Sequence, residues 1–400
     1  MKQLFLAGLC LAFLAACGGS NSSSNPSSLI SSDTTDASDE SVDPNENNET
    51  ATPSPDFTQA DAWMEGFVSA EALFAGGSYI IIDRDLGVIH KAVFGNQTED
   101  SLVLLASTSK VPTATLLMAI HDDETIEFDV NATIASYLPW PGVWDEDITT
   151  QQLLSNRSGM PGLGKILDSE AATAAHLCQF LPAGTLYACA EVLYTTTLPE
   201  LDSTPPGSAF DYGGSQWQLA GAVAETVGGA TWNQLWDQYI AQPCGMASST
   251  YGNNLSFAAA WDGHPESLQG RENPNMEAGM MANLDDYAKL LSLHLNEGMC
   301  GDNRVMSGES LAFMREMTTQ FANGGGYGMG WWLEAARDGD DITLFTDGGL
   351  WGSLSWIDTE RNYAGVVFFE EYTAVDASKG LAGIRGELIG IVAEAIDAAR

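Results

Sequence analysis

Positive charge is scarce in this chain of 400 residues. The sequence has 15 lysines and arginines against 54 aspartates and glutamates, which gives a formal net charge of −39 at pH 7. Nucleic acids and anionic lipid surfaces repel a protein with this charge. We therefore expect no nucleic-acid partner. The acidic surface is either a solubility device or an adaptation to a salty medium that screens the repulsion.

Patterns of metal ligands are also missing. No two cysteines have the C-x-x-C spacing, and the five histidines are scattered along the chain. A structural zinc site usually combines four such ligands at short spacings. The sequence therefore disfavours a zinc site, and we expect no metal and no cofactor.

Long apolar runs are absent beyond the first residues, since no later stretch approaches the ~20 residues that span a bilayer. Met1-Lys2 precedes an apolar run from Leu4 to Leu14, and Ala15-Ala16-Cys17 follows, as in an export signal with small residues at the cleavage site. This start resembles the lipobox of bacterial lipoproteins. The resemblance implies that Cys17 is the first mature residue and carries lipid, and Gly18 after it favours the outer membrane. An ordinary secretory signal cut nearby is the alternative.

Residues 20–56 contain almost no side chain that a core could bury. Such a composition predicts a disordered tether. We divide the chain into a signal peptide at 1–16, an acidic tether at 17–56 and a folded domain at 57–400. The 44% of hydrophobic residues suffice for a substantial core. We expect this domain to be a monomer in the cell envelope, with the lipid on Cys17 as its only membrane contact.

The cysteines predict disulfides. Cys10 leaves with the signal and Cys17 is the lipid site, so four cysteines remain in the domain. An even number in an exported protein indicates two disulfides, with three possible connectivities. We favour the pairs Cys178–Cys189 and Cys244–Cys300.

Hydrophobic periodicity predicts the elements of the domain. Aromatic residues at helical spacing predict a helix over 57–75, and apolar runs at 78–83 and 87–95 predict a hairpin. Later stretches predict helices at 219–227, 284–295 and 380–399 and strands at 342–346, 352–357 and 364–369. We therefore expect an α+β fold in which one antiparallel sheet is built from both termini. The α/β part would comprise 57–106 and 326–400, and a mostly helical lobe would comprise 107–325.

Ser107-Thr108-Ser109-Lys110 is the first candidate for chemistry. Serine and lysine three positions apart form the S-x-x-K pattern of serine β-lactamases and penicillin-binding proteins, and one helical turn places both side chains on one face. On its own the pattern also describes two polar residues on an exposed turn. Pro112 is tolerated only near the start of a helix, so the helix should begin close to Ser107, with its N–H groups near the serine.

Further stretches match one family in order and spacing. The sequence resembles the serine β-lactamase-like hydrolases nearest to class C β-lactamases over about 57–395. The matching stretches are 104–110, 148–161, 206–212 with its tyrosine motif, 243–246, 278–287 and 327–331. This resemblance implies that Ser107 forms an acyl-enzyme, with Lys110 and Tyr212 as proton-transfer partners. Alternatively, Tyr212 is a core aromatic.

The resemblance also places the rest of the site. The backbone N–H groups of Ser107 and, by the register of the family's edge strand, Leu350 would bind the oxyanion. Two positions depart from the family. Gly214 stands where the family has an asparagine that contacts the acyl group, and Asp347, before Gly348 and Gly349, stands where it has lysine or histidine. Asp347 would repel carboxylate-bearing substrates and admit cationic ones, or else it only caps the turn before the glycines.

Three functions follow from these observations. The first is an esterase or amidase for small neutral or cationic substrates. The second is a β-lactamase or D-alanyl-D-alanine carboxypeptidase, and the third is a non-catalytic lipoprotein that binds a ligand in the old cleft. Four tryptophans flank the C-terminal strands, and any that face the cleft would favour an apolar acyl group. We expect at most two of them in the pocket, from Trp331, Trp332, Trp351 and Trp356.

Overall fold

The structure is a computed structural model that describes residues 54–69, 74–198, 201–335, 341–370 and 374–400. The expected signal peptide, Cys17 and nearly all of the tether lie outside the described residues. Within the described residues, no helix is long and apolar enough to cross a bilayer.

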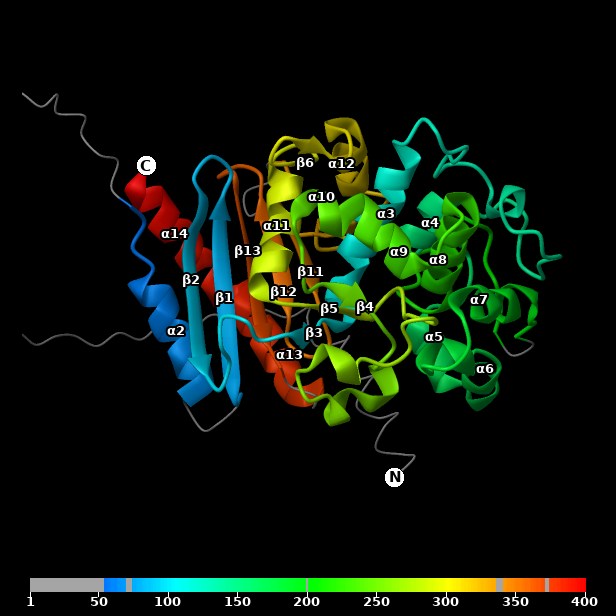
Figure 1. The fold of residues 1–400 in the computed structure, drawn as a ribbon, viewed down its shortest axis with the longest axis horizontal. Helices are drawn as coiled ribbons and strands as arrows, with labels where there is room; N and C mark the ends of the chain where they lie inside the picture. Colours follow the sequence, from blue (N-terminus) through cyan, green and yellow to red (C-terminus); the bar gives the residue numbers. More distant parts are fainter. Residues whose placement is uncertain (1–53, 70–73, 199–200, 336–340, 371–373) are drawn as a thin grey trace, which may run out of the picture.

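An eight-stranded antiparallel sheet forms the centre of the fold (Figure 1). Its strand order is β2-β1-β13-β12-β11-β10-β9-β8, so the first strand of the chain, β1, pairs with the last one, β13. The strands are β1 (Gly76–Asp83), β2 (Gly87–Gly95), β8 (Thr319–Gln320), β9 (Gly326–Tyr327), β10 (Trp332–Leu333), β11 (Leu344–Gly348), β12 (Leu354–Asp358) and β13 (Tyr363–Phe369). The prediction of an α+β fold with a sheet from both termini is confirmed.

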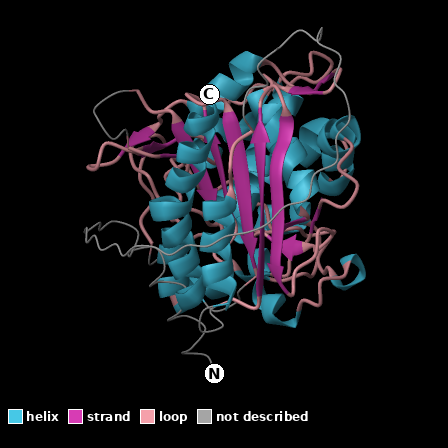
Figure 2. Cartoon of the chain, turned by 90° about the vertical axis from the view of Figure 1, so that its left-hand side faces the viewer, coloured by secondary structure: helices cyan, strands magenta, loops and turns pink. Residues whose placement is uncertain are grey.

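Helices cover both faces of this sheet (Figure 2). One face packs against α2 (Thr58–Ser69) and the C-terminal helices α13 (Ala374–Gly383) and α14 (Ile389–Ala399), which a π-helical turn joins. The other face packs against α3 (Lys110–His121) and α11 (Leu284–Leu295). Successive side chains of a strand point to opposite faces, so β1 is apolar at every position from 79 to 82 because both of its faces are buried.

A mostly helical lobe lies beside the sheet, on the right of Figure 1. Its centre is α8, whose residues 215–224 are all buried, and which packs against α3, α4 and α7. The lobe helices are α4 (Thr150–Leu154), α5 (Leu163–Asp168), α6 (Glu170–Ala175), α7 (Leu186–Thr195), α8 (Ser215–Gly228), α9 (Trp232–Trp236) and α10 (Gln242–Cys244). The range expected for this lobe also contains α11 and β8, and the structure places both with the sheet.

Smaller elements complete the described chain. A short sheet of β3 (Val103–Leu104), β5 (Met280–Ala282) and β4 (Thr250–Tyr251) lies between the lobe and the main sheet. The hairpin of β6 (Met299–Cys300) and β7 (Asn303–Arg304) precedes α12 (Gly308–Arg315). Both predicted disulfides are confirmed, with Cα–Cα distances of 5.6 Å for Cys178–Cys189 and 4.9 Å for Cys244–Cys300.

Candidate active site

Ser107 lies in a turn between β3 and α3. The turn is a 3₁₀ helix over Ala106–Ser109, and the α-helix begins only at Lys110, so the expected helix start is displaced by three residues from the serine. Ala106 has φ of 48°, a left-handed conformation that a non-glycine residue adopts at a cost of ~1 kcal/mol or more. Ser107 is 8% exposed. The backbone strain therefore lies immediately before the serine that would react.

Lys110 and Tyr212 both reach Ser107. The Lys110 Nζ atom is fully buried and lies 3.1 Å from the Ser107 Oγ atom. The Tyr212 side chain is hydrogen-bonded to both Ser107 and Lys110, and its ring centroid lies 4.5 Å from the Lys110 Nζ atom. The structure thus brings together the three residues that the sequence nominates for catalysis, over 105 positions of the chain.

A buried acid that the sequence analysis missed completes this cluster. Glu277 is 3% exposed, and its Oε2 atom lies 3.3 Å from the Lys110 Nζ atom. The backbone carbonyl of Glu277 also accepts a hydrogen bond from Lys110 at 3.2 Å. The sequence offered one signal: this acidic residue directly precedes the apolar stretch Ala278-Gly279-Met280-Met281, which begins a segment that matches the family.

The Tyr212-Gly213-Gly214 segment is shaped around this acid. Gly213 and Gly214 have φ of 72° and 85°, which favour glycine, and the Gly214 N–H donates to the Glu277 Oε2 atom at 2.9 Å. A Cβ atom on Gly213 would lie 2.5 Å from the same carboxylate oxygen. Gly214 stands where the family has an asparagine that contacts the acyl group, and here its N–H is bound to Glu277.

Asn156 holds the same segment from the other side. This buried residue has φ of 58°, and its Oδ1 atom accepts hydrogen bonds from the Gly213 N–H at 2.9 Å and the Trp217 indole at 2.8 Å. Asn156 therefore fixes the turn that follows Tyr212.

The structure places Asp347 in the interior of the fold. Its side chain is fully buried on β11, and its Oδ2 atom accepts the Val111 N–H in the first turn of α3 at 3.3 Å. It therefore satisfies an N–H group in the first turn of the helix that carries Lys110. Burial raises the pKa of this carboxyl well above its usual range, against the opposing effect of Lys110 and Arg385.

The end of β11 is locked against the turn of Ser107. A Cβ atom on Gly349 would lie 2.0 Å from the Leu105 carbonyl oxygen and 2.8 Å from the Thr108 Oγ1 atom. The Ser353 hydroxyl donates to the Leu105 carbonyl at 2.8 Å and contacts the Thr108 hydroxyl at 2.8 Å. Leu350, the expected second oxyanion donor, packs against the small cluster that contains Ala106. The two segments expected to form the oxyanion site are thus in contact.

The charges of the site favour a protonated lysine and a neutral tyrosine. Burial lowers the pKa of Lys110, but its electrostatic interactions with Tyr212, Glu277 and Asp347 outweigh burial and raise that pKa above its ordinary value. Burial raises the pKa of the Tyr212 phenol, and the Lys110 ammonium only partly offsets this rise. One proton must leave this pair before it can accept the proton of Ser107.

Aromatic rings surround Tyr212. Its ring lies 5.3 Å from the ring of Trp332 and 6.1 Å from that of Tyr327, and Phe210 and Phe321 extend the contacts outward. Phe210, Phe321 and Trp332 are partly exposed. Of the four tryptophans considered from the sequence, Trp332 alone keeps a partly exposed ring. The other three are buried: Trp331, Trp351 and Trp356.

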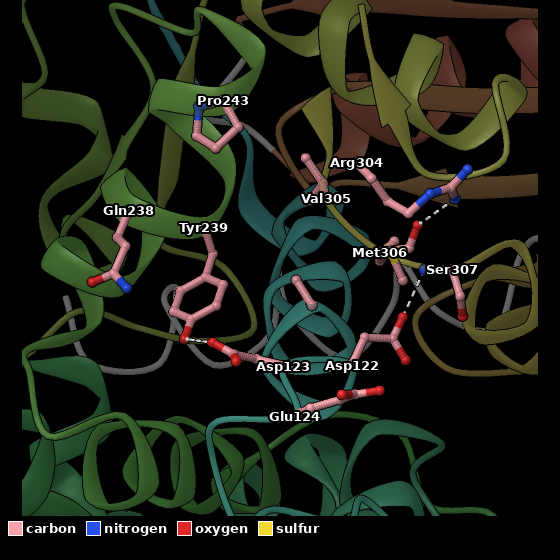
Figure 3. Close-up of a pocket in the computed structure, with 11 residues that line it drawn as sticks. Asp122, Asp123, Glu124, Gln238, Tyr239, Pro243, Arg304, Val305, Met306 and Ser307 are labelled. Carbon is pink, nitrogen blue, oxygen red and sulfur yellow. Dashed lines mark hydrogen bonds between the residues drawn. The ribbon is translucent and has the colours of Figure 1, made fainter. Parts of the chain in front are cut away.

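A cavity of about 550 Å³ lies elsewhere, at the C-terminal end of α3 (Figure 3). Two of its acidic side chains are already hydrogen-bonded within the protein. Asp122 accepts a hydrogen bond from the Ser307 N–H at 2.6 Å, and Asp123 accepts one from the Tyr239 hydroxyl at 2.7 Å. A 12-residue helix is ~18 Å long, so this cavity is about one helix length from Ser107. It is separate from the candidate catalytic centre. Among the described residues, no cluster of acids, histidines or cysteines suits a metal ion.

A serine beside a buried lysine and a tyrosine, at the junction of an antiparallel sheet and a helical lobe, defines a β-lactamase-like serine hydrolase in fold and site. A sequence profile described as "Beta-lactamase" matches residues 61–384, which is most of the chain. The chain therefore belongs to the beta-lactamase family, whose members are serine hydrolases.

Similar proteins illustrate the range of that family. Penicillin-binding protein 4 of Amycolatopsis lactamdurans is 26% identical over 314 residues, which cover 70% of this chain and 75% of that protein. The structure of the octameric penicillin-binding protein homologue from Pyrococcus abyssi has a TM-score of 0.64 at 19% identity, covering 83% and 78% of the two chains. EstCE1, a hydrolase with promiscuous acyltransferase activity, has a TM-score of 0.64 at 18% identity, covering 84% and 97%. The structural matches establish the fold.

Proposed function

We propose that this protein hydrolyses ester or amide bonds through an acyl-enzyme on Ser107. The observation that supports this most directly is the 3.1 Å contact between the Lys110 Nζ and Ser107 Oγ atoms, with Tyr212 hydrogen-bonded to both. The Ser107 oxygen attacks the substrate carbonyl, and its proton passes to the deprotonated member of the Lys110–Tyr212 pair. The pair returns the proton to the leaving oxygen or nitrogen. Water then cleaves the acyl-serine ester, releasing the acid and restoring Ser107.

The aromatic rings around Tyr212 support a neutral substrate with an apolar acyl group. Phe210, Phe321 and Trp332 offer partly exposed ring faces beside the tyrosine. Burying a methylene group in an apolar site contributes ~1 kcal/mol. Asp347, which had suggested cationic substrates, is fully buried. We therefore propose neutral esters and amides as the substrate class.

Purified domain carrying residues 54–400 tests this proposal. We expect p-nitrophenyl butyrate to be hydrolysed and a fluorophosphonate probe to label Ser107. The matched control is Ser107→Ala, which removes the nucleophile and leaves the surrounding residues in place. Equal turnover by wild type and Ser107→Ala, with no labelled serine, contradicts the proposal.

A second candidate function is a β-lactamase or D-alanyl-D-alanine carboxypeptidase. The similarity to a penicillin-binding protein favours it, whereas the lack of a cation at position 347 disfavours binding of a substrate carboxylate. Turnover of nitrocefin, or covalent labelling by penicillin that Ser107→Ala abolishes, would establish this activity. The third candidate, a non-catalytic ligand-binding lipoprotein, has less support because Lys110 and Tyr212 both still reach Ser107.

We also propose that the hydrolase works in the cell envelope, anchored by lipid on Cys17. The two disulfides support an oxidising compartment, and the sequence at 14–17 supports lipidation. Full-length protein should incorporate labelled palmitate and sediment with membranes, and Cys17→Ser should do neither. Membrane association that survives Cys17→Ser rules out the lipid anchor.

A further inference from the structure

We infer that Glu277 is a positioning residue for hydrolysis: its carboxylate holds the Lys110 ammonium beside Ser107 and at the same time holds the glycine turn that follows Tyr212. This inference rests on the proposed function of Ser107. It assigns a role to a residue that no local motif marks and that lies 167 positions after Lys110.

The contacts of Glu277 support both halves of this role. One carboxylate oxygen, Oε2, lies 3.3 Å from the Lys110 Nζ atom and accepts the Gly214 N–H at 2.9 Å. The same residue binds Lys110 a second time through its backbone carbonyl at 3.2 Å. The Asn275 side chain in turn accepts the Glu277 N–H at 3.1 Å. One buried oxygen atom therefore contacts both the Lys110 side chain and the glycine turn that follows Tyr212.

The backbone at the two glycines after Tyr212 leaves space for the Glu277 carboxylate. Gly213 admits no Cβ atom, because that atom would lie 2.5 Å from the Glu277 Oε2 atom. Gly214, at φ of 85°, directs its N–H to the same oxygen. The glycine that departs from the family's asparagine is thus matched by an acid 63 positions later. Where the family has an asparagine side chain that contacts substrate, this chain has the contact between Gly214 and Glu277. That contact fixes Lys110 and Tyr212 relative to each other.

Several charged or titratable groups face Lys110. Tyr212 comes from the loop before α8, Glu277 from the segment before β5, and Asp347 from β11. Tyr327 lies near both Glu277 and Tyr212. Glu277 is the acid whose carboxylate oxygen lies within ion-pair distance of the Lys110 ammonium, at 3.3 Å. An opposite charge within ~4–6 Å typically raises a lysine pKa by roughly one to three units.

The pH dependence of Glu277→Gln tests the inference. The substitution keeps the shape and one acceptor oxygen but removes the charge, so deprotonation of Lys110 becomes easier. We expect the rising limb of the kcat/KM profile for p-nitrophenyl butyrate to move down by about one pH unit or more. The control is Glu272→Gln, which removes one charge at an exposed position five residues away and should leave the limb unmoved.

The other outcomes separate a structural role from a positioning role. A uniform loss of kcat/KM at every pH, with the limb unmoved, would overturn the inference. Activity in wild type that Ser107→Ala retains contradicts the proposed function instead. If Glu277→Gln folds but is too unstable to assay, thermal unfolding of Glu277→Gln and of the double variant Lys110→Met with Glu277→Gln decides. Recovery of Tm over Glu277→Gln alone supports coupling to Lys110, and no recovery refutes it.

Discussion

The close approach of Gly349 to the Leu105 carbonyl oxygen should make the proposed oxyanion site sensitive to a single methyl group. In Gly349→Ala, the new Cβ atom would lie 2.0 Å from that oxygen, whereas ordinary contact begins at 3.4 Å. The end of β11 and the turn of Ser107 must therefore separate by about 1.4 Å. Gly349 itself does not have a positive φ, so the effect of the added methyl group is steric.

The expected loss follows from that displacement. Oxyanion donors act at ~2.7–3.1 Å, so a shift above 1 Å removes most of the contribution of the Leu350 N–H. Loss of one such donor lowers kcat by ~10²–10³-fold, or ~2.7–4 kcal/mol. We expect this loss for p-nitrophenyl butyrate, with KM changed much less, because the oxyanion forms only in the transition state.

A matched control lies one residue earlier. A Cβ atom on Gly348 meets the flexible end of Arg385 at 3.3 Å and two leucine side chains at 3.5 and 3.6 Å. Gly348→Ala should therefore retain kcat within about threefold, which corresponds to less than ~1 kcal/mol. Circular dichroism and thermal unfolding are used to check that both variants fold. If folded Gly349→Ala matches Gly348→Ala in kcat, the assignment of the oxyanion site to this contact is refuted.

Three further predictions concern the surroundings of Tyr212. First, kcat/KM should rise with pH above neutrality, because the pKa values of Lys110 and Tyr212 are both raised and one proton must leave the pair; a flat profile from pH 6 to 10 would exclude this. Second, Trp332→Ala should reduce the preference for p-nitrophenyl butyrate over the acetate by about tenfold. The same substitution at the buried Trp356 should leave that preference unchanged. Third, Asn156→Ala should lower the free energy of unfolding by about 2–4 kcal/mol in urea titrations, since it strands the buried Gly213 and Trp217 donors; a loss under 1 kcal/mol would show that water replaces the amide.

The sequence predicted those parts of the site that short motifs specify. Ser107 and Lys110 are three positions apart, so a local pattern and a start-of-helix proline sufficed to identify them. Tyr212 required only a second motif whose order along the chain matched the family. The sheet followed from apolar runs at both termini, because strands buried on both faces have few polar positions.

Contacts that depend on tertiary structure were not predictable in the same way. Glu277 meets Lys110 across 167 positions, and neither residue carries a local sign of the other. Asp347 was assigned from its place in an aligned motif, but alternation along β11 turns it toward the first turn of α3. From the sequence, Gly214 indicated only that the family's substrate-binding asparagine is missing. The structure shows that its N–H binds the Glu277 carboxylate instead.

The pairing of β1 with β13 also has a consequence for the order in which the domain can form. β1 ends at Asp83, and its partner strand begins at Tyr363, so ~280 residues must be synthesised before this pair can close. Until then, the N-terminal hairpin has an open edge and an uncovered apolar face. A chain whose synthesis has not reached β13 therefore lacks its native sheet. The candidate catalytic residues, which lie between β1 and β13 in sequence, take their final places only after β13 has been made.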